Sequence, residues 1–185
     1  MKSRLLSVAA LLIVVGTASA ATKQKWTPGW DNFSAPLNLK TSSVTWSVND
    51  TTKKLTLTFT LVGAAPTSLF QLSLNFFCTT FPATFGQFPN DTPGGGSCES
   101  ATRQGVTETI AEVEVGAILT DINGDGSLTV VIGPVASGTY DLEFFVRNGA
   151  GCEVSGGGGN GVSICEADFQ SPGPTFGDAT TITVP

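Results

Sequence analysis

The run DINGDGSLTVV, which begins at Asp121, contains the side chains best suited to bind a metal ion. Oxygen ligands recur at its first, third and fifth positions, as Asp121, Asn123 and Asp125, and a glycine follows where a calcium loop needs a sharp turn. The carbonyl of Ser127 would take the seventh position. The twelfth is Ile132 instead of a bidentate glutamate, which excludes an EF-hand. Because Asn-Gly and Asp-Gly also favour tight turns, the sequence leaves a structural calcium ion and a plain turn both open.

Two further oxygen ligands depend on how the chain returns to this turn. If residues 127–133 and 139–147 form a hairpin, the second strand ends beside the Asp121 turn, and Asn148 and Glu153 follow it. The calcium hypothesis therefore comprises Asp121, Asn123, Asp125, Ser127, Asn148 and Glu153.

The absence of histidine excludes several chemistries. Ser-His-Asp and Cys-His catalysis, and zinc or copper sites built on histidine, all require it. Carboxylates remain: Glu112 and Glu114 alternate on one predicted strand, and Asp141 and Glu143 on another. Two carboxylates can hydrolyse glycosides, but acidic residues are ordinary on the solvent face of a strand. We therefore expect a protein that is not an enzyme, with a carboxylate-dependent carbohydrate-processing enzyme as the alternative.

Two aromatic clusters are candidate binding surfaces. Trp26 and Trp30 lie in the segment KWTPGWDNF, and Phe81, Phe85 and Phe88 lie in a loop rich in proline and glycine. Such rings can stack on sugars. The alternative is that they hold irregular segments against the core, since large apolar groups rarely stay exposed in number.

The even number of cysteines indicates disulfides in an exported chain. Three pairings of Cys78, Cys98, Cys152 and Cys165 are possible. We predict Cys78–Cys98 and Cys152–Cys165, because each pair brackets one glycine-rich excursion between strand-like runs.

The elements that would position these residues are strands. Apolar residues alternate with polar ones in residues 44–48, 55–61, 70–76, 106–119, 128–132, 140–146 and 180–184. Turn-forming clusters separate these runs, and 106–119 reads as two strands or one bulged strand because its apolar parity changes near Ala111. The pattern predicts an all-β, antiparallel, Ig-like or prealbumin-like sandwich of 7–8 strands with two disulfide-bracketed loops. The stretches that begin at Leu55 and Ser127 share one plan, strand, Gly/Pro turn, strand and cysteine, which duplication or convergence explains equally well.

The stretch TDINGDGSLTVVIGPVASGTYDLEFFV, residues 120–146, resembles a hairpin of prealbumin-like and carboxypeptidase-regulatory-like sandwich modules of exported bacterial proteins. The resemblance rests on Thr120, Asp121, Gly126, Gly138 and Tyr140. It implies a non-catalytic spacer, surface or binding module and supplies no active site.

Residues 1–20 form a predicted signal peptide: Lys2 and Arg4 precede an apolar run, and Ala18-Ser19-Ala20 suits cleavage. Residues 21–185 are then one expected domain. The formal net charge of −6 and the scattered basic residues make nucleic acid a poor partner. We expect a secreted or periplasmic protein, not embedded in a membrane, that binds an extracellular protein or glycan in a surface-binding or adhesion-type role. A purely structural component of an extracellular assembly is a further alternative.

Overall fold

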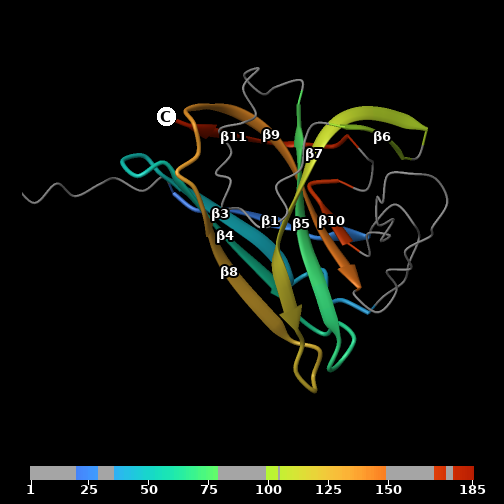
Figure 1. Cartoon of the computed structure of the whole chain (residues 1–185). Coiled ribbons are helices and arrows are strands. Elements are labelled where there is room, and N and C mark those ends of the chain that lie inside the picture. The colour runs from blue at the N-terminus through green and yellow to red at the C-terminus, as the bar shows by residue number, and fades with distance from the viewer. Residues whose placement is uncertain (1–19, 29–35, 79–98, 104, 149–168, 174–176) are drawn as a thin grey trace, which may run out of the picture.

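The chain folds into strands arranged in two antiparallel sheets (Figure 1). The computed structural model describes residues 20–28, 36–78, 99–103, 105–148, 169–173 and 177–185. Within these ranges the strands are β1 (Thr22–Lys25), β2 (Thr27–Pro28), β3 (Ser43–Asn49), β4 (Lys54–Leu61), β5 (Leu69–Phe77), β6 (Glu99–Arg103), β7 (Val106–Leu119), β8 (Gly126–Ile132), β9 (Gly138–Asn148), β10 (Phe169–Ser171) and β11 (Thr180–Val184). None of the described residues forms a helix long and apolar enough to cross a membrane. The all-β class and the antiparallel pairing are confirmed, and the two sheets are consistent with a β-sandwich.

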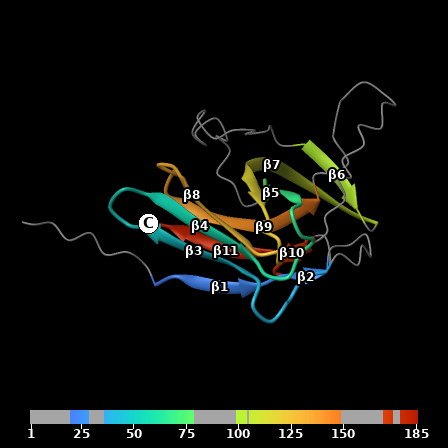
Figure 2. The same ribbon diagram turned by 90° about the horizontal axis from the view of Figure 1, so that it is seen from below.

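The smaller sheet has four strands in the order β1-β3-β4-β8, with β1 and β8 at its edges (Figure 2). Its apolar residues alternate as expected, so that Trp46, Leu57 and Phe59 are buried against the other sheet. The registers from β3 to β4 and from β4 to β8 run without interruption. The outward-facing residues of the three strands therefore form straight rows across the sheet.

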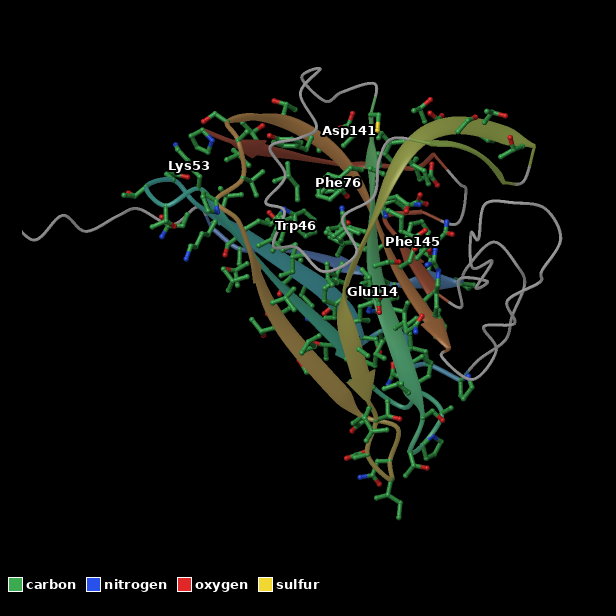
Figure 3. The ribbon with its side chains drawn as sticks, in the orientation of Figure 1. Trp46, Lys53, Phe76, Glu114, Asp141 and Phe145 are labelled. Carbon is green, nitrogen blue, oxygen red and sulfur yellow. The ribbon has the colours of Figure 1, made fainter. Side chains whose placement is uncertain are left out.

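The larger sheet has seven strands, ordered β2-β10-β9-β5-β7-β6, with β11 also paired to β9. Leu74, Phe76 and Phe144 face the core from β5 and β9. The ring of Phe144 stacks on Trp46 of the opposite sheet at 5.5 Å between centroids. Figure 3 shows Trp46 and Phe76 within the body of the molecule. The common core is therefore rich in aromatic contacts that join the two sheets.

Residues 106–119 form one strand with an irregularity. Leu72 pairs with Gly116 and Ser73 with Glu114, so that Val115 is an extra residue in β7. The change of apolar parity near Ala111 has another cause. Ile110 packs with Phe77 in a second, smaller cluster, whereas Ala111 and Val113 are buried with the opposite parity. The bulged strand is the correct alternative, but its bulge does not lie at the change of parity.

The expected hairpin of 127–133 and 139–147 is wrong. β8 pairs with β4 in the smaller sheet, and β9 pairs with β5 in the larger one. The connection passes from one sheet to the other at Gly133 and Val135, whose amide donates to the carbonyl of Lys53. Each of the two strands buries one face in the common core. The alternating sequence pattern is therefore the same whether β8 and β9 pair in one sheet or lie in opposite sheets, and it could not distinguish the two arrangements.

The two stretches with a shared sequence plan have corresponding places in the fold. β4 and β8 are antiparallel neighbours in the smaller sheet, and the strands that follow them, β5 and β9, are antiparallel neighbours in the larger sheet. Each stretch therefore forms one strand of each sheet.

Four of the strands had no apparent signal in the sequence: β1, β2, β6 and β10. Cys78 is the only cysteine in the described part of the chain, because Cys98, Cys152 and Cys165 lie outside it. Residues 1–19 of the predicted signal peptide also lie outside it. The disulfide pairing, the signal peptide and the single domain remain predictions.

Candidate functional site

The Asp121 turn is closed by hydrogen bonds within the chain. The Oδ1 atom of Asp121 accepts from the amides of Asn123 at 2.7 Å and Asp125 at 2.9 Å. These backbone donors hold the pKa of the Asp121 carboxyl below its usual range. Asp125 Oδ1 accepts from the amide of Gly63 at 2.8 Å, which links the turn to the neighbouring connection from β4 to β5. Both carboxylates therefore have a structural role in this turn.

The proposed calcium ligands that the structure describes come from the turn and from two strands. Ser127 lies on the outward face of β8, opposite Thr60, and Asn148 lies at the end of β9, paired with Phe70. Glu153 is outside the described residues. Among the residues that are described, no three acidic or cysteine side chains are grouped as a metal site. Calcium binding stays a prediction, which a rise of melting temperature in millimolar calcium, abolished by Asp125→Ala, would support.

Trp26 is not available to a ligand. Its side chain is 2% exposed, its ring stacks on Phe59 at 6.0 Å, and its indole Nε1 donates to the carbonyl of Thr60 at 3.2 Å. Trp26 is therefore corrected as a candidate binding residue, and the other alternative holds for it, since its ring lies against the core. The other candidates, Trp30, Phe81, Phe85 and Phe88, lie outside the described residues.

An outward face of different chemistry lies on the smaller sheet. In β3, β4 and β8 most of the residues that point away from the core are serine or threonine, and the exceptions are Asn49, Lys54 and Val131. We call this surface the hydroxyl face, and it comprises Thr45, Ser47, Thr56, Thr58, Thr60, Ser127 and Thr129.

The register aligns these side chains in rows across the sheet. Thr45 pairs with Thr58, and Thr58 pairs with Thr129. The hydroxyls of Thr58 and Thr129 are 2.9 Å apart and share a hydrogen bond. Ser127 and Thr129 are exposed, and the threonines of β4 are partly exposed. The sequence shows the alternating threonines, but the rows depend on strand pairing that the sequence does not specify.

No acidic residue lies on β3, β4 or β8. The chain has 15 aspartates and glutamates, and solvent faces of strands commonly use charged residues. Threonine is favoured in strands by its branched side chain, which explains why the strands accept it. The strand preference of threonine does not explain why the hydroxyl face has no acidic residue.

The outward face of β5 and β9 in the larger sheet carries a buried polar cluster. Asn75 pairs with Glu112 on one side and Glu143 on the other, and both Asn75 and Glu143 are 0% exposed. Arg147 is 7% exposed, forms an ion pair with Glu112, and lies 5.8 Å over the ring of Phe145. Charged residues that alternate with apolar ones along a strand, as Glu143 and Arg147 do, are expected on its solvent face, and here that expectation is wrong. No signal in the sequence distinguishes a polar strand face that is buried from one that is solvated.

The amide of Asn75 has no hydrogen-bond partner among the described residues. A buried polar group without a hydrogen bond reduces the stability of the fold, and native proteins contain few of them. The cluster places one carboxylate on each side of Asn75, and one of the two, that of Glu112, forms the ion pair with Arg147.

No protein-family model matches the chain, and no curated protein matches it. A solved structure from work on the pH-induced modulation of Streptococcus parasanguinis adhesion by Fap1 fimbriae overlays on the chain with a TM-score of 0.34 at 11% identity. The overlay covers 91% of this chain and 95% of that one. A likeness this distant assigns neither a fold family nor a function to the chain.

Proposed function

We propose that this chain is an exported, non-catalytic surface-binding module, and that its hydroxyl face binds a polysaccharide surface. The observation that carries the proposal is the set of aligned rows of serine and threonine on β3, β4 and β8, without an acidic residue on these strands. The signal peptide predicted for residues 1–20 would direct export.

The chemistry of the face suits a hydroxylated, repeating ligand. Hydroxyls recur about 6.7 Å apart along each strand and about 4.8 Å apart between strands. Each threonine offers a donor, two acceptor lone pairs and a methyl group. A sugar polymer also presents hydroxyls and apolar C–H groups at regular intervals. Because the strands hold the side chains in place, binding costs little ordering of the protein.

The alternative of a carboxylate-dependent enzyme rests on the pair Glu112 and Glu114 and on the pair Asp141 and Glu143. A glycosidase needs an acid and a base that reach the substrate from a cleft. Here Glu143 is 0% exposed, and Glu112 forms an ion pair with Arg147. This arrangement favours a structural polar network and supports the non-catalytic proposal.

The test is a pull-down with insoluble polysaccharides such as cellulose and chitin, comparing the wild type with the Thr58→Val/Thr129→Val variant. Valine keeps the shape and strand preference of threonine but removes both hydroxyls of the hydrogen-bonded pair. Each lost hydrogen bond to the ligand is expected to cost about 0.5–1.5 kcal/mol, which weakens binding about tenfold for the pair.

The matched control is Thr183→Val, which removes an exposed hydroxyl from β11 in the other sheet. It should bind like the wild type. Equal binding by the double variant, or no retention of the wild type on any of the polymers, would refute the proposal.

A further inference from the structure

The edge strand β8 lacks, within its own sequence and register, the charges, prolines and bulges that usually protect a strand edge. It pairs with β4 along its whole length, from Leu61↔Gly126 to Leu55↔Ile132, and its other side pairs with no strand in the part of the chain that is described. Its sequence GSLTVVI contains no charge and no proline, and its register with β4 has no bulge. Natural edge strands use charges, proline or bulges to prevent pairing with other chains. The opposite edge of the same sheet, β1, carries Lys23 and Lys25.

Apolar side chains of β8 are incompletely covered on both faces of the strand. Leu128 and Val130 face the core but remain only partly buried, and Val131, which points outward beside Thr129, is 59% exposed. Strand β11 provides the contrast, because Thr180, Ile182 and Val184 are all buried. A strand added beside β8 would cover apolar surface as well as satisfy backbone donors and acceptors.

The two ends of β8 have opposite charge. Asp125, which is exposed, directly precedes the strand. Lys53 and Lys54 lie beside its far end, where the carbonyl of Lys53 accepts from Val135, and Figure 3 shows Lys53 at that end of the molecule. Antiparallel pairing of β8 with its own copy about a two-fold axis at Thr129 brings each acidic end toward the basic end of the partner.

We propose that β8 of one molecule pairs with β8 of a second copy, which joins the two four-stranded sheets into one eight-stranded sheet. The pairing would place Ser127 opposite Val131 and would continue the hydroxyl face from one molecule to the other. The dimer does not depend on the polysaccharide proposal, although it would double the length of the face and increase its avidity for a repeating ligand.

The test is sedimentation equilibrium of the purified protein. The full chain has a mass of 19.0 kDa, and the method separates monomer from dimer clearly with or without residues 1–20. The wild type should associate to a dimer with increasing concentration. The variant Thr129→Lys/Val131→Lys places lysines next to one another across the two-fold axis, where like charges opposite one another destabilise pairing. It should raise the dissociation constant at least about tenfold.

The matched control is Thr56→Lys/Thr58→Lys, which adds the same charge to the same face on the central strand β4. It should dimerise much more strongly than the β8 variant. A monomeric wild type at all concentrations would overturn the proposal, and so would equal weakening by the two variants or no weakening by the β8 variant. Circular dichroism confirms that each variant is folded. The oligomeric state and the pull-down are measured separately, so failure of one proposal is distinguishable from failure of the other.

Discussion

The side chain of Asp121 stabilises the turn that it begins. Its carboxylate does so in the ionised form, because it accepts hydrogen bonds from the backbone of the turn. Two backbone amides donate to Oδ1, and they lower the pKa of the carboxyl in the folded protein. The sequence correctly indicated a turn at DINGDG, since Asn-Gly and Asp-Gly tolerate the required conformations. It did not indicate that the Asp125 carboxylate bonds to Gly63, because that contact depends on a connection distant in the sequence.

The lowered pKa of Asp121 predicts a pH-dependent stability. An aspartate with a lower pKa in the folded than in the unfolded chain stabilises the fold above about pH 4, and the contribution is lost as the pH falls through the folded pKa. Asp121→Asn should therefore lower the melting temperature at pH 7, and the difference from the wild type should shrink as the pH falls below 4. Melting curves from pH 7 to pH 2 provide the measurement. A difference that stays constant over this range would contradict the role of the charge.

Gly124 is required for steric as well as conformational reasons. It has φ of +80°, and a Cβ atom there would lie 1.9 Å from the carbonyl oxygen of Ala64. Gly105 has a similar φ of +77° with nothing within 4 Å, so it is a matched control. Gly105→Ala should cost about 1–2 kcal/mol from backbone strain alone. Gly124→Ala should cost clearly more, because the connection 62–68 must move. Chemical denaturation measures both, and equal losses would show that the close approach does not matter.

At the scale of elements, alternation predicted the strands that bury an apolar face, such as β4 with Leu55, Leu57 and Phe59. It missed β1, whose sequence TKQK contains no apolar residue, and β10, which has three residues. It also could not decide which strands pair, as the error over β8 and β9 shows. The hydroxyl face depends on that pairing, and the buried cluster at Asn75 depends on what covers a polar strand face. Neither candidate surface could therefore be predicted from the sequence.

Trp26 connects the two sheets at the N-terminus. It is the single residue between β1, in the smaller sheet, and β2, in the larger one. Trp26→Ala should destabilise the protein by about 3–5 kcal/mol, since it removes a buried aromatic side chain. Trp26→Phe should cost less, because it retains a ring against Phe59 and loses mainly the hydrogen bond to Thr60. Guanidinium denaturation tests the order, and a loss below about 1 kcal/mol for the alanine variant would contradict this role.

At the scale of the whole molecule, each of two stretches contributes one strand to each sheet. β4 continues into β5, and β8 into β9, and the pairs are neighbours in both sheets. The segment that contains β4 and β5 and the segment that contains β8 and β9 therefore link the two sheets through the backbone. The aromatic contacts add to this coupling, because Phe144 of the larger sheet contacts both Trp46 and Phe59 of the smaller one.

This shared construction predicts that the two sheets unfold together as one cooperative unit. Tryptophan fluorescence reports on Trp26, Trp30 and Trp46, and far-ultraviolet circular dichroism reports on all strands. The two signals should give coincident denaturation curves. Phe144→Ala should lower stability by about 3–5 kcal/mol and move both curves by the same amount, although the residue lies in the larger sheet only. Val131→Thr, an exposed change on β8, should leave both curves in place. If fluorescence and circular dichroism reported separate transitions, the sheets would be independent and the expectation of one domain for residues 21–185 would be wrong.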